Sequence, residues 1–168
     1  MDFFVCLAAT RIDHGDMEQA IVDPKWRNYI IDFTEVSGRL CVLRIKGKFF
    51  NYSILNVYAP HNELLNEEKD PFYALLERTY CECPRNDVKI VIGDLNAQVG
   101  RERVFSSIIG SHSLHKESND NGIRLINFAA MMNMVVSSTS FQRKNIQKHT
   151  YAPTHLCEVI KKPRLTIF

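Results

Sequence analysis

The stretch that decides the fold is residues 88–100, Val-Lys-Ile-Val-Ile-Gly-Asp-Leu-Asn-Ala-Gln-Val-Gly. Its β-branched run up to Gly93 is typical of a strand buried in a sheet, and the glycine then lets the backbone turn. Asp94 and Asn96 follow two residues apart, so in an extended segment they point the same way. A carboxylate beside a carboxamide at a strand end can hold a metal, a water or a phosphate. The alternative is an Asx turn, in which both side chains only bond local backbone.

The flanking segments predict an α/β fold. Strands are expected at residues 40–45, 49–58, 88–93, 134–138, 139–141 and 149–151. Helices are expected at residues 67–83 and 123–132. Their apolar faces predict a shared core of Phe72, Leu75, Leu76, Leu125, Phe128 and Met132. Because the first helix separates two strands, those strands are expected to be joined by a crossover and not to be hairpin partners.

A second candidate strand end lies at Tyr58-Ala59-Pro60-His61. Pro60 cannot donate to a ladder, so the strand is expected to stop there and the chain to leave the sheet. This places Tyr58 and His61 at a strand end, where open α/β sheets usually carry functional side chains. The alternative for Tyr58 is a packed aromatic ring with a satisfied hydroxyl.

The composition is that of an ordinary globular domain, with 45% hydrophobic and 24% charged residues. Its 21 basic and 19 acidic residues nearly balance, so the total charge makes no case for nucleic acid. From Arg143 onward, however, the chain contains six basic residues and one acidic residue. This basic end is either a phosphate-binding segment or a solvated tail. Five irregularly spaced cysteines, and an apolar run at residues 3–9 without a basic flank, predict an intracellular protein with no membrane association, nuclear or cytoplasmic and not secreted.

Three motifs in register carry a family resemblance. They are Asn56-Val57-Tyr58-Ala59-Pro60, Gly93-Asp94-Leu95-Asn96, and Asn121-Gly122-Ile123-Arg124-Leu125 followed by Thr139-Ser140-Phe141. Together they resemble the endonuclease/exonuclease/phosphatase (DNase I-like) superfamily, and within it the endonuclease domains of non-LTR retrotransposons and the craniofacial development protein 2-like proteins. The resemblance divides the chain into a divergent segment at residues 1–29, a partial domain at 30–151 and a divergent basic tail at 152–168.

The resemblance implies a four-layer α/β sandwich, incomplete at both ends, that cleaves DNA phosphodiesters with Mg²⁺ or Mn²⁺. It implies that Asp94 orients or deprotonates the attacking water and is a metal ligand, that Asn96 binds the scissile phosphate region, and that Tyr58 hydrogen-bonds a phosphate oxygen. Such chemistry needs an aligned water and donors around the developing charge. By the same resemblance, the phosphate or nucleic-acid contacts are expected from His61, Asn121 and Arg124.

Two departures from the family pattern leave the activity open. The family's Gln-Glu-Thr strand, whose Glu is the chief metal ligand, is absent before Ile30, and Glu18-Gln19 has the wrong order. The terminal Asp-His motif is also absent, since no Asp precedes His155. The sequence therefore predicts either a Mg²⁺-dependent endonuclease or a catalytically inactive remnant or truncated gene product, which is at most a weak nucleic-acid-binding module.

Overall fold

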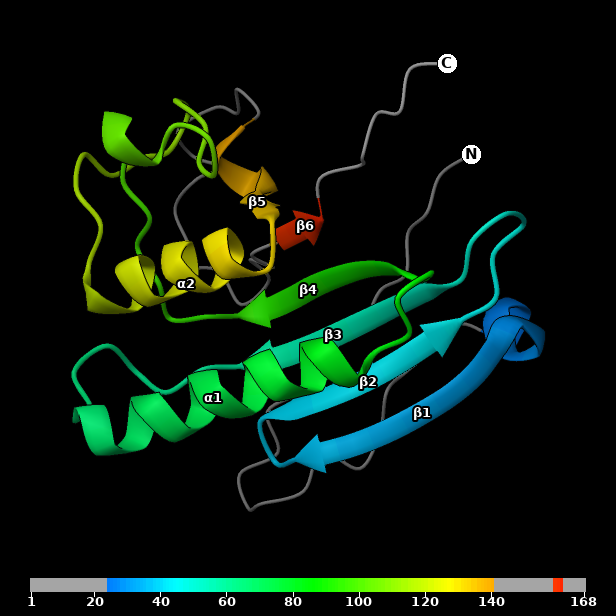
Figure 1. Ribbon diagram of the computed structural model, residues 1–168. Helices are drawn as coiled ribbons and strands as arrows, with labels where there is room; N and C mark the ends of the chain where they lie inside the picture. Colours follow the sequence, from blue (N-terminus) through cyan, green and yellow to red (C-terminus); the bar gives the residue numbers. More distant parts are fainter. Residues whose placement is uncertain (1–23, 141–158, 162–168) are drawn as a thin grey trace.

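A computed structural model describes residues 24–140 and 159–161 as a mixed α/β fold (Figure 1). Its strands are β1 (Ile30–Ser37), β2 (Leu40–Ile45), β3 (Tyr52–Tyr58), β4 (Val88–Asp94), β5 (Met134–Val136) and β6 (Val159–Lys161). Its α-helices are α1 (Asn66–Glu82) and α2 (Asp120–Met131). Three 3-10 helices cover Pro24–Tyr29, Arg103–Phe105 and Ser137–Thr139. The expected α/β class is confirmed.

The strands form one sheet in the order β1-β2-β3-β4-β6-β5. Strands β1, β2 and β3 pair antiparallel, and the chain then crosses over through α1 so that β4 pairs parallel with β3. The expected crossover is present, and β2 and β3 form an antiparallel hairpin. The crossover matters for function, because parallel neighbours end at the same edge of a sheet.

Element boundaries differ from expectation where side chains give no hydrophobic pattern. The strand β1 was not expected, because five of its eight residues are exposed and it therefore lacks an alternating apolar face. Helix α2 begins three residues before Ile123, because Asn119 caps it. The strand expected at 139–141 is wrong at Thr139, which lies in a 3-10 helix and bonds Val136 and Gly110. The expected strand at 149–151 lies outside the described residues.

Both faces of the sheet carry apolar clusters. Helices α1 and α2 cover one face (Figure 1), and their residues join the side chains of β3 and β4 in the larger cluster. Of the six expected helix residues, Leu75 and Met132 are partly buried against this cluster and the other four are fully inside it. The opposite face holds a second cluster of Leu43, Ile45, Ile54 and Ile92. The described residues thus form one sheet layer and one helix layer. A four-layer sandwich would place its second sheet against that opposite face.

We expect Leu76→Ala and Leu125→Ala each to lower the free energy of unfolding by about 2–5 kcal/mol. Both side chains are 0% exposed in the larger cluster, so truncation leaves a cavity between helix and sheet. Urea unfolding measures the change, with Leu65→Ala as the matched control because Leu65 is 69% exposed. An unchanged midpoint in either buried variant would contradict the helix faces described above.

None of the helices within the described residues is long and apolar enough to cross a membrane.

Candidate phosphate-binding site

Tyr58 and Asp94 lie side by side at one end of the sheet. They are direct partners in the parallel β3–β4 ladder, and the Ala59 N–H donates to the Asp94 carbonyl at 2.8 Å just beyond it. Alternation along the strands puts both side chains in the same rows as Ile54 and Ile92, on the face away from the helices. Asp94 is exposed and Tyr58 is half-buried. The Tyr58 hydroxyl and the Asp94 carboxylate therefore lie at the same edge of the sheet, here called the rim.

Asn96 closes the loop after β4 in a left-handed conformation, with φ +47°. Its backbone N–H donates to Asp94 Oδ1 at 2.9 Å, which is the Asx turn considered from the sequence. Its side-chain Nδ2 donates to the Ala59 carbonyl at 2.7 Å, across to the segment after β3. In the described part of the chain Asp94 makes this one side-chain hydrogen bond, so its Oδ2 stays available. The Asx turn and a functional carboxylate are therefore compatible.

Two further groups flank the Tyr58 ring. The Tyr58 hydroxyl and His61 Nε2 are 3.4 Å apart, with the two rings nearly perpendicular. Arg39, from the β1–β2 turn, places its guanidinium 5.2 Å from the Tyr58 ring centroid and donates to the Tyr58 carbonyl at 3.5 Å. Arg39 was not found from the sequence. The register of the β2–β3 hairpin could have indicated Arg39. Leu40 pairs with Val57, so the next antiparallel pair places Arg39 beside Tyr58.

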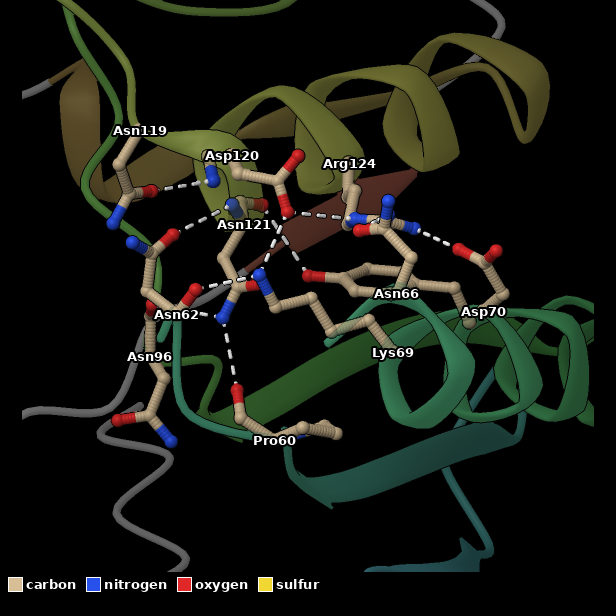
Figure 2. Close-up of polar contacts among 12 residues, drawn as sticks. Pro60, Asn62, Asn66, Lys69, Asp70, Asn96, Asn119, Asp120, Asn121 and Arg124 are labelled. Carbon is tan, nitrogen blue, oxygen red and sulfur yellow. Dashed lines mark hydrogen bonds and ion pairs between the residues drawn. The ribbon is translucent and has the colours of Figure 1, made fainter. Parts of the chain in front are cut away.

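The N-terminus of α2 packs against the loop after β4 (Figure 2). The Asn119 side chain caps α2 by accepting from the Gly122 N–H at 2.7 Å, and it also accepts from the Gln98 N–H at 3.0 Å. Asn121 donates through Nδ2 to the Pro60 and Asn96 carbonyls, at 2.9 and 3.1 Å. The third sequence motif therefore braces the other two.

Asn121 and Arg124 were expected to contact phosphate, but in the structure both side chains bind other residues of the protein. Asn121 is 0% exposed, so it has no surface for a direct phosphate contact. Arg124 pairs with Asp120 and Asp70 and donates to Asn66 (Figure 2). These contacts join the first turns of α1 and α2, and the guanidinium is occupied there.

Lys69 completes this connection between the helices. It is 3% exposed and donates to Asp120 Oδ2 at 2.9 Å and to the Asn62 carbonyl. Hydrogen bonds from Lys69 and then from Arg124 lower the pKa of the Asp120 carboxyl below its ordinary value. Asp120 thus stays ionised and pairs with two cations. These contacts stabilise the packing of α2 against α1.

Comparisons with known proteins agree with this architecture. No protein-family model matches the chain. Craniofacial development protein 2 from Bos taurus is 34% identical over 131 residues, and that from Tragulus javanicus is 33% identical over the same length. Each alignment covers 78% of this chain and 22% of the relative. The endonuclease domain of TRAS1, a telomere-specific non-LTR retrotransposon, aligns with a TM-score of 0.50 and 9% identity, over 82% of this chain and 56% of that domain.

The chain is similar to craniofacial development protein 2 over 131 residues and has a DNase I-like fold. The fold expected from the sequence is thereby confirmed. The chain spans about a fifth of the length of its craniofacial development protein 2 relatives, with 22% of each covered.

The resemblance to DNase I-like enzymes implies a divalent metal, but the described residues do not fit a complete site for one. Within residues 24–140 and 159–161, no three His, Cys, Asp or Glu side chains gather as metal ligands. Asp94 is the carboxylate at the rim, and its neighbours Tyr58, Asn96 and Arg39 are neutral or cationic. Mg²⁺ prefers carboxylate and phosphate oxygens in octahedral geometry, so Asp94 alone would hold it weakly.

Proposed function

We propose that Arg39, Tyr58, His61, Asp94 and Asn96, here called the phosphate rim, bind a nucleic-acid phosphodiester and take part in its hydrolysis. DNA is the expected substrate, and a non-LTR retrotransposon is the expected origin of the domain. The observation that carries the proposal is the pairing of Tyr58 with Asp94 at the shared end of two parallel strands. The likeness to an endonuclease domain supports it.

The chemistry follows from the groups at the rim. The Tyr58 hydroxyl and the Arg39 guanidinium supply hydrogen-bond donors for the non-bridging phosphate oxygens. His61, 3.4 Å from that hydroxyl, orients it. Asp94 Oδ2 accepts a hydrogen bond from a water and takes its proton as the water oxygen attacks phosphorus. The bond from phosphorus to the leaving oxygen then breaks, and that oxygen is protonated by solvent.

A second candidate function is nucleic-acid binding without cleavage. It is favoured because, among the described residues, no three His, Cys, Asp or Glu side chains gather as metal ligands. Hydrolysis and simple binding share the donors Arg39 and Tyr58 and differ in their need for Asp94. A binding experiment therefore tests the common part of both functions, and a cleavage experiment separates them.

We expect Arg39→Ala to weaken binding of a fluorescently labelled DNA duplex about tenfold, because one charge-assisted contact to a phosphate is lost. The plot of log K against log salt concentration should flatten by about 0.9, the slope that belongs to one phosphate contact. Fluorescence anisotropy over a salt series measures both quantities.

The matched control for this binding experiment is Arg85→Ala. Arg85 is exposed just before β4, at the opposite end of the sheet, so its removal should leave affinity and slope as in the unaltered chain. An unaltered chain that binds no duplex at low salt would count against the proposed function. Equal slopes for the two variants would count against the place of Arg39 in the rim.

A further inference from the structure

Asn121 is a fully buried polar side chain whose hydrogen bonds converge on the two loops of the phosphate rim. Its Nδ2 donates to the carbonyl of Pro60, which follows β3, and to the carbonyl of Asn96, which follows β4. Among the described residues, its Oδ1 is buried and has no hydrogen-bond partner. Buried polar atoms are nearly always paired, and an unpaired one costs stability. Because the unpaired oxygen lowers the stability of the fold, we infer that Asn121 serves a purpose other than stability.

The position of Asn121 is itself fixed from three sides. Its backbone N–H donates to Asn62 Oδ1 at 3.2 Å, and its carbonyl accepts from the Tyr73 hydroxyl. The next residue, Gly122, lies so close to the loop after β4 that a Cβ there would be 2.1 Å from the Gln98 carbonyl oxygen. Figure 2 shows this turn held between the start of α1 and the loop that carries Asn96. These contacts fix the backbone of Asn121 and therefore the position of its carboxamide.

Asn96 needs such support because its backbone is left-handed, with φ +47°. This conformation costs free energy for a residue with a side chain, and it persists only where neighbouring contacts impose it. Three hydrogen bonds impose it here. They join the Asn96 N–H to Asp94, its Nδ2 to Ala59 and its carbonyl to Asn121. The Asn121 bond is the one that reaches Asn96 from the helix side of the sheet.

We propose that Asn121 is a positioning residue of the phosphate rim. Its carboxamide holds Asn96 left-handed, and this keeps the Asp94 carboxylate beside Tyr58. Asn121 contacts no phosphate, and this role replaces the direct contact expected from the sequence. The consequence for DNA rests on the proposed function, whereas the conformational effect at Asn96 does not.

The conformation of Asn96 can be read by NMR in the 168-residue chain. A positive φ brings the amide proton close to the α proton of the same residue, which gives a strong intraresidue nuclear Overhauser effect. We expect this signal at Asn96 in the unaltered chain, a marked weakening in Asn121→Ala, and a loss of duplex affinity of about tenfold in the same variant.

The matched control is Ser53→Ala. Ser53 is also 0% exposed and also loses a buried hydrogen bond, to Asp87, but it lies at the other end of β3. A general loss of stability would affect both variants, whereas only Asn121→Ala should alter the Asn96 signal. An unchanged signal in Asn121→Ala overturns the proposal. A lost signal, together with an unaltered chain that binds no DNA, supports the positioning role and counts against the proposed function.

If Asn121→Ala does not fold, hydrogen exchange in the unaltered chain decides. We expect the Asn121 side-chain amide protons to exchange at least about a hundredfold more slowly than those of Asn127, which is exposed on the same helix. Similar exchange rates for the two carboxamides would overturn the proposal, because the bonds to Pro60 and Asn96 would then not persist in solution.

Discussion

The purified 168-residue chain is expected to nick supercoiled plasmid slowly in Mg²⁺ or Mn²⁺, and Asp94→Ala is expected to reduce nicking to the level seen without protein. A slow rate is expected because the phosphate rim has one carboxylate, Asp94, which alone would hold a divalent cation weakly. The loss in the variant is expected because Asp94 Oδ2 is the proposed base that deprotonates the attacking water. Removing one such group typically costs about 10²–10³ in rate.

Conversion of supercoiled to open-circular plasmid over time measures this rate, and Asp32→Ala is the matched control. Asp32 is an exposed carboxylate on β1, so its removal changes the net charge without touching the rim. Nicking that survives Asp94→Ala would show that the activity does not come from the phosphate rim. Rapid nicking that Asp94→Ala abolishes would show that the chain assembles a more complete metal site than its described residues contain.

The sequence predicted the central fold because its strongest hydrophobic patterns coincide with the buried elements. β4 is a β-branched run, α1 has a regular apolar face, and both were located within a few residues. β1 was missed because it is an edge strand whose residues are mostly exposed. Its backbone hydrogen bonds to β2, and not the burial of its side chains, hold it in the sheet. Hydrogen bonding along an edge leaves no hydrophobic pattern in the sequence.

The candidate site was predictable where function and strand ends coincide. Tyr58 and Asp94 were expected at strand ends, and the parallel ladder brings them together. Arg39 and the bracing role of Asn121 depend on contacts between residues 19 and 61 positions apart, which a single sequence does not reveal. The roles of all these residues in phosphate chemistry remain predictions that the experiments above address.

Gly93→Ala should destabilise the chain by roughly 3 kcal/mol or more, because two independent penalties act at that position. Gly93 has φ +130°, a conformation that residues with a side chain rarely adopt and that costs strain. A Cβ built there lies 2.0 Å from the carbonyl oxygen of Val57, a backbone atom of the adjacent strand that cannot move aside alone. Relieving that overlap requires β3 and β4 to separate, which adds an overpacking cost.

The consequence of Gly93→Ala reaches the phosphate rim, because Val57–Gly93 is the ladder pair immediately before Tyr58–Asp94. We therefore expect a lower urea midpoint and, in the folded fraction, altered NMR shifts at Tyr58 and Asp94. Gly38→Ala is the matched control. Gly38 is exposed in the β1–β2 turn and its φ is not positive, so the free energy of unfolding of this variant should stay within about 0.5 kcal/mol of that of the unaltered chain. A Gly93→Ala midpoint equal to that of Gly38→Ala would contradict the close approach of β3 to β4 that sets Tyr58 beside Asp94.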